Sequence, residues 1–422
     1  MKIKTGLLLV CFLVLIVANV SGQGIEKELN ITTMKISNEL KSINNEITRI
    51  NAEEGQEEAV EKIDITIDAQ SGMNITVDHK FGDIKVVKGT NDKITIKGEK
   101  RVTSDNKTSA EAFLKKVSLE VDENPGRVKV ISKFPEKIDS EKENIESFSL
   151  NFTMEVPENV QIQVSNSFGG TDVVGLSGEI HVDSKMGAVN AVSLKGDIYL
   201  SSSFGSLTAE NLDGSVNASA QNGSLDISNV NGDLNANSRF GDIKIFDVKG
   251  KAEIIGGNGE IYVEKIRQIT SVTGQFGPIT VKDIEDRLSV ENKNGNVEVF
   301  NVKGYVNVQN SFGAVVVDGA ANDVNVNTRN GNVNLSNVFF GKSDVMRTIV
   351  VNNTFGRIEI ELPSDLSAKI KAFSNFGDIK NDFGLEVETA SFTKKNLDGK
   401  VGGGKDAVWL EGNNTTIVIK KK

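Results

Sequence analysis

Ten glycines follow one another at intervals of eighteen residues, without a single insertion: Gly169, Gly187, Gly205, Gly223, Gly241, Gly259, Gly277, Gly295, Gly313 and Gly331. A fixed period of this length is typical of a solenoid, in which each repeat packs only on its neighbours. A chain of 422 residues could otherwise hold several globular domains. The period predicts instead one long repetitive fold.

Within each repeat, apolar residues alternate with polar ones, which predicts strands with one face turned inward. The inward positions recur as Leu207, Ala209, Leu212, Val216 and Ala218, and again as Val297, Val299, Val302, Val306 and Val308. A second glycine series lies half a period away, at Gly178, Gly196, Gly214, Gly232, Gly250 and Gly304, with Gln268, Asp286 and Asn322 in the same phase. We therefore expect an all-β solenoid (β-helix) of two short strands per repeat, joined by tight turns with positive φ.

The residue before each main glycine alternates between phenylalanine and asparagine: Phe204, Asn222, Phe240, Asn258, Phe276, Asn294, Phe312 and Asn330. If one turn of the solenoid uses 18 residues, large and small side chains alternate in a single stack. If it uses 36, phenylalanine stacks on phenylalanine at a spacing of roughly 4.8 Å. Both arrangements put the phenylalanines in phase with the core, so Phe240→Ala should cost about 3–5 kcal/mol.

The first 22 residues have the order of a secretory signal peptide. Lys2 and Lys4 precede an apolar run from Leu7 to Ala18, and the small residues Ser21 and Gly22 follow it. The run is shorter than the roughly 20 residues that a membrane-spanning helix needs. We expect cleavage after Gly22, export of the chain, and no transmembrane segment afterwards.

The single cysteine, Cys11, lies inside that apolar run. A lipid-modified cysteine would follow a small residue at the end of such a run, but Val10 precedes Cys11 and the run continues. The mature chain is therefore expected to contain no cysteine, and hence no disulfide and no thiolate metal site.

Residues 23–60 predict an amphipathic helix, because Ile36, Leu40, Ile43, Ile47 and Ile50 have heptad spacing. Such a helix could form a short coiled coil, giving a homo-oligomer through residues 25–50. It could equally pack on the body of the protein. The sequence leaves both possibilities open.

Three further segments complete the expected organisation. Residues 61–164 contain irregular strands and one helix, for which Thr108 and Glu111 have the spacing of a capping box. This segment should cap the solenoid, since an open end exposes core and unpaired strand edge. Residues 165–340 form the regular repeat. Residues 341–422 continue it irregularly and add a C-terminal cap, with a last strand from Trp409 to Lys422.

The charge excludes some classes of partner. The chain has 48 basic and 58 acidic residues, a net charge of −10, and loss of Lys2 and Lys4 makes it more negative. Nucleic-acid binding relies on Lys and Arg to displace counterions. We therefore expect no nucleic acid and no anionic membrane surface among the partners.

Catalytic and metal-binding chemistry is sparse. The only histidines, His79 and His181, lie among alternating strand residues, where exposed side chains are expected. Residues 256–259, Gly-Gly-Asn-Gly, begin like a calcium-binding β-roll repeat, but Ile261 stands where that repeat needs aspartate. The sequence thus predicts no catalytic residue, no metal and no cofactor.

A polysaccharide-active enzyme, a lyase or glycosidase, is the alternative class because such enzymes also use parallel β-helices. It would need carboxylates or a base beside an aromatic-lined groove. Asp242 and Asp378 recur with the turn motif and are interpreted as structural. The side chains available for sugar stacking are few: Trp409, Tyr199, Tyr262 and Tyr305.

Short motifs resemble a known family. Phe-Gly-Asp-Ile occurs at 81–84, 240–243 and 376–379, and Met-Glu-Val-Pro-Glu-Asn at 154–159. Over about residues 62–422 the chain resembles the bacterial putative-adhesin family of unknown function, and it is similar to head domains of putative autotransporter adhesins. The resemblance implies an exported or envelope-associated β-helical domain without a defined active site.

The functional hypothesis is a non-catalytic protein of the periplasm, cell surface or extracellular space. It would bind an unknown envelope or surface ligand, protein or polysaccharide, or serve as a passive structural spacer.

Overall fold

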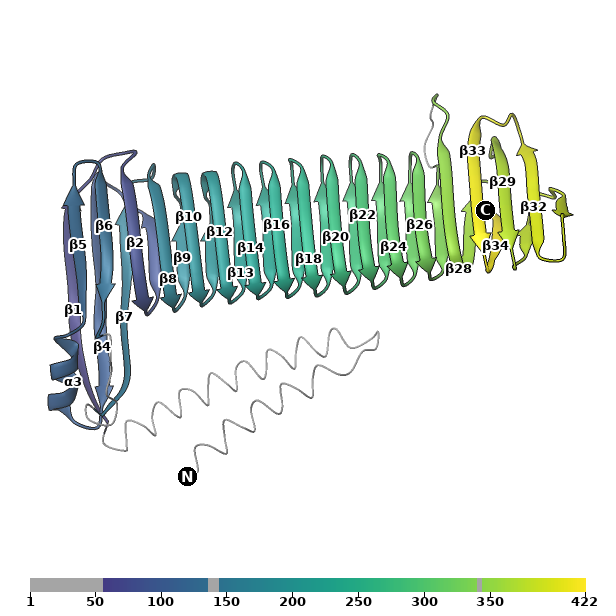
Figure 1. The fold of residues 1–422 in the computed structure, drawn as a ribbon. Coiled ribbons are helices and arrows are strands. Elements are labelled where there is room, and N and C mark those ends of the chain that lie inside the picture. Colours follow the sequence, from purple (N-terminus) through teal and green to yellow (C-terminus); the bar gives the residue numbers. More distant parts are fainter. Residues whose placement is uncertain (1–55, 136–143, 340–343) are drawn as a thin grey trace.

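The computed structural model describes residues 56–135, 144–339 and 344–422. Its strands lie side by side along one axis (Figure 1), and the prediction of an all-β solenoid is confirmed. The expected signal peptide, Cys11 and the heptad segment at 25–50 lie outside these residues. In the described ranges, no helix is long and apolar enough to cross a membrane.

Each turn of the solenoid contributes one strand to each of two parallel sheets, A and B. Sheet B contains β8 (Gln161–Phe168), β10 (Ser177–Met186), β12 (Lys195–Phe204), β14 (Val216–Asn222), β16 (Leu234–Phe240), β18 (Ala252–Asn258), β20 (Thr270–Phe276), β22 (Leu288–Asn294), β24 (Val306–Phe312) and β26 (Val324–Asn330). Sheet A contains β9 (Thr171–Val174), β11 (Val189–Val192), β13 (Leu207–Leu212), β15 (Leu225–Val230), β17 (Ile243–Val248), β19 (Ile261–Ile266), β21 (Ile279–Ile284), β23 (Val297–Val302), β25 (Val315–Ala320) and β27 (Val333–Val338).

The register settles the length of one turn. Phe240 of β16 pairs with Asn222 of β14, and Ile245 of β17 pairs with Ile227 of β15. Paired residues are therefore eighteen apart in the sequence, and the alternative of 36 residues per turn is wrong. Phenylalanine and asparagine alternate up one stack.

The core runs along the axis between the two sheets. The inward positions expected from the alternation are all buried, both in the turn from Leu207 to Ala218 and in the turn from Val297 to Val308. Because every turn repeats the same inward pattern, aliphatic side chains stack on those of the turns above and below. This shared interior is what ties the turns together.

The positive φ expected at the turn glycines is present at most of the main series, such as Gly241 and Gly277, and close stacking of the corners gives a second reason for glycine. A Cβ on Gly277 would lie 2.0 Å from the carbonyl oxygen of Gly259 in the neighbouring turn, so stacked corners leave no room for a side chain. In the second series, Gly250 has no positive φ, yet its Cβ would lie 2.3 Å from the Gly232 oxygen. A further ladder of positive φ is formed by non-glycine residues, including Asn211, Asn229, Asp247, Asp283 and Asn301.

A buried polar column holds the corner that follows each strand of sheet B. Asn310 Nδ2 donates to the carbonyl oxygens of Gly295, at 3.1 Å, and Gly313, at 3.0 Å. Ser202, Ser238 and Asn292 bond in the same way to the glycine of their own corner, and Asn353 bonds to Gly331 of the preceding turn. The side chains thereby satisfy corner carbonyls that the sheet ladders leave unpaired.

The Gly-Gly pair that begins like a calcium motif has a packing role in this column. A Cβ on Gly256 would lie 2.6 Å from Ile261 Cδ1, and one on Gly257 would lie 2.4 Å from the Arg239 oxygen. Both glycines are needed because their neighbours fill the space around them.

At the N-terminal end, the first parallel turn is formed by β2 (Asn74–Phe81) and β3 (Ile84–Lys88), which pair with β8 and β9. Beyond it lie β6 (Arg127–Lys133), parallel to β2, and β7 (Ile145–Val156), parallel to β3. The outermost pairings are antiparallel and involve β1 (Glu57–Asp68), β4 (Lys93–Ser104) and β5 (Ser118–Asn124).

The expected helix is α3 (Lys107–Leu114). Its N-cap is Asn106, whose side chain accepts a bond of 2.8 Å from the Ser109 amide. The capping box at Thr108 and Glu111 is therefore wrong, because asparagine two residues earlier already supplies the cap.

At the C-terminal end, the order in space differs from the order in sequence. The expectation of one last strand from Trp409 to Lys422 is wrong, because Asn414, with a φ of 52°, separates two strands. These are β33 (Asp406–Asn413) and β34 (Thr415–Lys421), and both pair with β28 (Thr348–Leu362). On their other side lie β29 (Ala368–Asn375) and β30 (Ile379–Asn381). The antiparallel strands β31 (Val387–Thr389) and β32 (Lys394–Val401) follow at the end (Figure 1).

Candidate functional site

The phenylalanines before the main glycines lie on the surface, not in the core. Phe240 is 46% exposed and Phe276 53%. The expectation that these rings are buried is wrong, and with it the expected cost of Phe240→Ala. The cause is a bend at the end of each sheet B strand. Ser238 points inward, but Arg239 and Phe240 both point outward as the chain turns toward Gly241.

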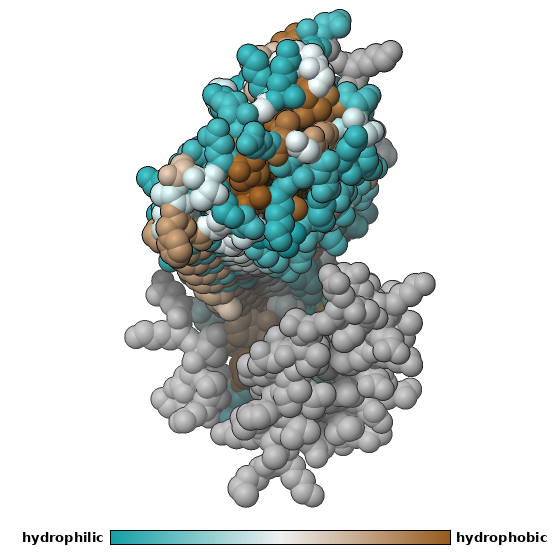
Figure 2. All heavy atoms as spheres, turned by 90° about the vertical axis from the view of Figure 1, so that its right-hand side faces the viewer, coloured by the Kyte–Doolittle hydropathy of each residue, from teal (hydrophilic) through white to brown (hydrophobic). Residues whose placement is uncertain are grey.

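These side chains lie in one row along the solenoid axis, which we call the Phe column. Its exposed apolar members are Phe168, Met186, Phe204, Phe240, Phe276, Phe312 and Phe355, each 40–54% exposed. At its N-terminal end, Phe81 stacks on Phe168 with ring centroids 4.9 Å apart and planes 9° apart. A band of hydrophobic side chains runs along one edge of the molecule in Figure 2, seen from the C-terminal end.

In the middle of the Phe column, from Phe204 to Phe312, aromatic rings recur every second turn. Two turns span roughly 9.6 Å at the usual strand spacing. Asparagines occupy the turns between them: Asn222, Asn258, Asn294 and Asn330. Each apolar ring is thus followed by an amide that can donate and accept hydrogen bonds.

A row of basic residues borders the Phe column on the sheet B side. Lys185, Arg239, Lys293 and Arg329 each directly precede a member of the stack, and all four are exposed. The Arg239 guanidinium lies 5.4 Å from the centroid of the Phe240 ring. This edge therefore carries local positive charge on a chain whose net charge is −10.

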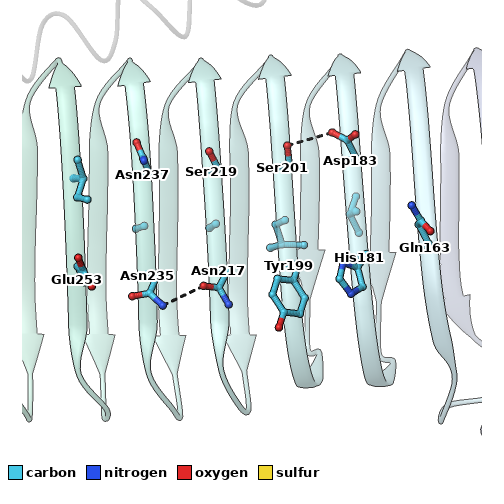
Figure 3. Close-up of a pocket in the computed structure, with 15 residues that line it drawn as sticks. Gln163, His181, Asp183, Tyr199, Ser201, Asn217, Ser219, Asn235, Asn237 and Glu253 are labelled. Atoms are coloured by element: carbon cyan, nitrogen blue, oxygen red, sulfur yellow. Dashed lines mark hydrogen bonds between the residues drawn. The ribbon is translucent and has the colours of Figure 1, made fainter.

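The same sheet also carries a shallow groove of about 530 Å³ on its outer face (Figure 3). His181 and Tyr199 stack in it with ring centroids 4.4 Å apart. His181 is partly exposed, and its Nε2 lies 2.9 Å from Glu179 Oε1. Amides form half of the remaining polar lining, and Asn235 Nδ2 donates to Asn217 Oδ1 at 3.1 Å.

The carboxylates of the groove do not form a catalytic pair. Asp183 and Glu253 both line the groove and lie four turns apart, roughly 19 Å along the axis. Glycosidases hold their two carboxyl groups about 5–9.5 Å apart. Asp183 instead accepts a hydrogen bond of 3.2 Å from the Ser201 hydroxyl (Figure 3).

His79 is buried, contrary to expectation. It lies in the first turn at the place that Asn166 occupies in the next, within the inner polar column. Burial lowers the pKa of His79 to about 4, and nearby backbone groups of Leu150 and Gly82 only partly oppose this effect. The ring is thus neutral at neutral pH and packs edge-on against Phe152, with centroids 5.2 Å apart.

The aspartates of the turn motif are structural, as expected. Asp242 Oδ1 accepts a bond of 2.8 Å from the Glu260 amide in the neighbouring turn. Asp378 pairs with Lys395 at 2.5 Å, and this contact lowers the pKa of the Asp378 carboxyl.

The other aromatic candidates are dispersed. Trp409 is 50% exposed on the C-terminal part of sheet B. Tyr262 lies on sheet A, where its hydrogen bond to Glu264 and its partial burial raise the pKa of its hydroxyl to about 12. Tyr305 immediately precedes β24, and of these four aromatic residues Tyr199 alone lies in the groove. Among the described residues, no three His, Cys, Asp or Glu side chains form a group that could hold a metal ion.

Fold and surface together define the class of molecule: a parallel β-solenoid with exposed aromatic rings along one edge. No family model matches the chain, and no curated protein matches it. Among solved structures, it is similar to a putative cell adhesion protein from Clostridium sporogenes ATCC 15579, with 10% identity, 87% of this chain and 100% of the other covered, and a TM-score of 0.22. It is also similar to a putative adhesin from Bacteroides fragilis NCTC 9343, with 11% identity, coverage of 65% and 96%, and a TM-score of 0.25.

Both descriptions name the class that the sequence motifs resemble. At these TM-scores the overall likeness carries no argument about function. The surface of this chain is therefore the basis for assigning one.

Proposed function

We propose that this chain is a non-catalytic, exported cell-envelope protein that binds a surface ligand along the Phe column, in the manner of an adhesin. The observation that carries the proposal is the row of seven apolar side chains, each 40–54% exposed, which follows the solenoid axis. Contiguous exposed apolar patches mark interaction sites in soluble proteins. A passive spacer has no need for such a row, because the core alone holds the turns together.

Export is part of the proposal and rests on residues 1–22, with their basic, apolar and small segments. The periplasm, the cell surface and the extracellular space all fit this signal. Mass spectrometry of protein recovered from the medium or envelope would test it, with Gln23 as the expected first residue.

The non-catalytic part rests on the groove, whose two carboxylates are too far apart to act as a glycosidase pair. Incubation of the purified protein with acidic polysaccharides should release no soluble fragments. Specific release of fragments would support the enzyme alternative instead.

The binding test compares the mature protein with a triple Phe variant, in which Phe240, Phe276 and Phe312 are changed to serine. A matched control changes Phe246 and Phe300, which lie on the outer face of sheet A, to serine. We expect the wild type and the control to bind intact bacterial cells or isolated envelopes, and the triple Phe variant to lose that binding. Equal binding by all three would overturn the proposal, and no binding by any would favour the spacer.

A homo-oligomer through residues 25–50 stays a prediction. It rests on the heptad spacing alone. The molar mass in solution of the full mature chain would test it against Ile43→Asp, which should dissociate a coiled coil.

A further inference from the structure

We infer that the ligand of the Phe column is an extended, β-linked polysaccharide that carries negative charge and lies parallel to the solenoid axis. This inference rests on the proposed function and names the class of its ligand. Three properties of the surface support it: the spacing of the rings, the amides between them, and the charge beside them.

The first property is spacing. Rings from Phe204 to Phe312 recur every two turns, roughly 9.6 Å. In an extended β-1,4-linked chain each sugar is turned over relative to the last, so equivalent ring faces recur every second sugar, at about the same distance. The C–H groups on a sugar face pack against the electron-rich face of an aromatic ring. One such chain could therefore contact successive rings in register.

The second property is the set of asparagines between the rings. In the described part of the chain, the side-chain amides of Asn258, Asn294 and Asn330 make no hydrogen bond. Asn294 and Asn330 are partly exposed. They lie opposite the sugar units that the rings do not stack on. Hydroxyl groups of those units can exchange hydrogen bonds with the amides.

The third property is charge. Lys185, Arg239, Lys293 and Arg329 flank the Phe column on one side, and within the described residues none of them is in an ion pair. On the other side of the corner lie Asp242 and Glu260, so in the middle of the Phe column the basic residues lie on the sheet B side. Because the chain is acidic overall, a local basic row of this kind favours an anionic ligand at this edge only.

A second copy of the chain fits the surface less well. Two columns packed antiparallel could place phenylalanine opposite asparagine, but the same symmetry would bring the basic row of one copy against the basic row of the other. Like charges brought together at an interface oppose association. Charge complementarity thus favours an anionic polymer over an antiparallel dimer, and the oligomeric state of the triple Phe variant tests the parallel arrangement.

The test uses three probes that separate sugar stacking from charge. Carboxymethylcellulose is a β-1,4-linked chain with carboxylates, hydroxyethylcellulose has the same backbone without them, and polyglutamate has carboxylates without sugar rings. We expect the full mature protein to bind carboxymethylcellulose roughly tenfold or more tightly than hydroxyethylcellulose, and not to bind polyglutamate. Added salt should weaken the binding of carboxymethylcellulose and leave the binding of hydroxyethylcellulose unchanged.

Two variants and their controls assign the binding to this edge. The triple Phe variant should lose roughly tenfold or more in affinity for both cellulose derivatives. Changing Arg239, Lys293 and Arg329 to glutamine should reduce binding of carboxymethylcellulose only. The control with Lys244, Lys251 and Arg267 changed to glutamine has the same net charge and should bind like the wild type.

Three outcomes would overturn the inference. Binding of polyglutamate as tight as that of carboxymethylcellulose would mean that charge alone suffices. Conversion of a dimer into a monomer by the triple Phe variant would mean that a second copy covers the column. Thirdly, cell binding could depend on the Phe column while neither cellulose derivative binds. In that last case the proposed function stands and the ligand class is wrong.

Discussion

The corner after each sheet B strand depends on one small polar side chain that faces inward and bonds to glycine carbonyls. Asn166, Ser202, Ser238 and Asn310 all have this role. In the first turn the place belongs to His79, a titratable residue whose ring nitrogens make no well-formed hydrogen bond among the described residues. Stability at this end should therefore depend on pH.

The pKa of His79 is about 4 in the folded protein, against an ordinary value of 6.5 in the unfolded chain. Between these values the unfolded chain binds a proton that the folded one does not. Stability is therefore fully present above pH 6.5 and is lost as the pH falls toward 4, by about 2–3 kcal/mol at pH 4.5. Urea unfolding of the wild type and of His79→Asn should show this loss only in the wild type, and parallel curves would contradict it.

Surface and core positions of a single turn differ sharply in what they contribute. Phe240 is half exposed, so Phe240→Ala should cost about 1 kcal/mol or less. Ile245, in the same turn, is fully buried, and Ile245→Ala should cost about 2–5 kcal/mol. Denaturant unfolding of the two variants measures the difference. Equal losses of unfolding free energy in the two variants would mean that Phe240 is part of the core.

Between neighbouring elements, the stacked corners leave the least tolerance for substitution. Gly277 has a φ of 125° and faces the Gly259 oxygen of the neighbouring turn, whereas Gly72, with a φ of 80°, has open space where a Cβ would lie. The two glycines thus share an unusual backbone conformation but differ in crowding.

We expect Gly72→Ala to cost about 1–2 kcal/mol, for backbone strain alone. Gly277→Ala should cost clearly more, because the neighbouring turn has to move away. Thermal unfolding of both variants provides the comparison, and a milder effect at Gly277 would show that the turns do not stack as closely as described.

The C-terminal end depends on a buried ion pair. Arg347 Nη2 lies 3.0 Å from Asp406 Oδ2, and their side chains are only 11% and 5% exposed. Arg347 also donates to the carbonyl oxygen of Phe339 at 2.9 Å. Through Arg347, the ion pair links the start of β33 to the backbone at Phe339, which follows β27.

Asp406→Ala leaves a buried guanidinium without its carboxylate and should cost about 3–5 kcal/mol. Hydrogen exchange should then accelerate in β33 and β34 while sheet strands near Leu207 stay protected. Uniform acceleration along the whole solenoid would contradict a local role.

For the molecule as a whole, much of the fold could be predicted from the spacing of the glycines and aliphatic residues. That spacing repeats without insertion over ten turns, and every aliphatic residue assigned to the inward face from it is buried. The order of the C-terminal strands could not be predicted, because the register of β33 between β28 and β29 depends on contacts between residues distant in sequence.

The exposed edge was harder to predict, although the sequence contains a signal for it. Extending the alternation of Leu234, Ala236 and Ser238 by one more step puts Phe240 inside, and only the bend after Ser238 turns it out. The signal for an exposed edge is the asparagine that alternates with phenylalanine in this stack, as at Asn222 and Asn258. A core position that accepts phenylalanine and asparagine in strict alternation would leave an amide buried at every second turn.

The Phe column has its alternating composition only if one turn uses eighteen residues, since that length places phenylalanine and asparagine next to each other on the exposed edge. Paired cysteines measure the length of a turn, because Cys11, in the expected signal peptide, is the only cysteine. With Asn222 and Phe240 both changed to cysteine, mild oxidation should form a disulfide, because these residues are register partners. With Phe204 and Phe240 changed instead, the two thiols lie two turns apart, roughly 9.6 Å, and should stay free. The reverse result, a disulfide only in the second pair, would mean that one turn uses 36 residues and would contradict the structure described above.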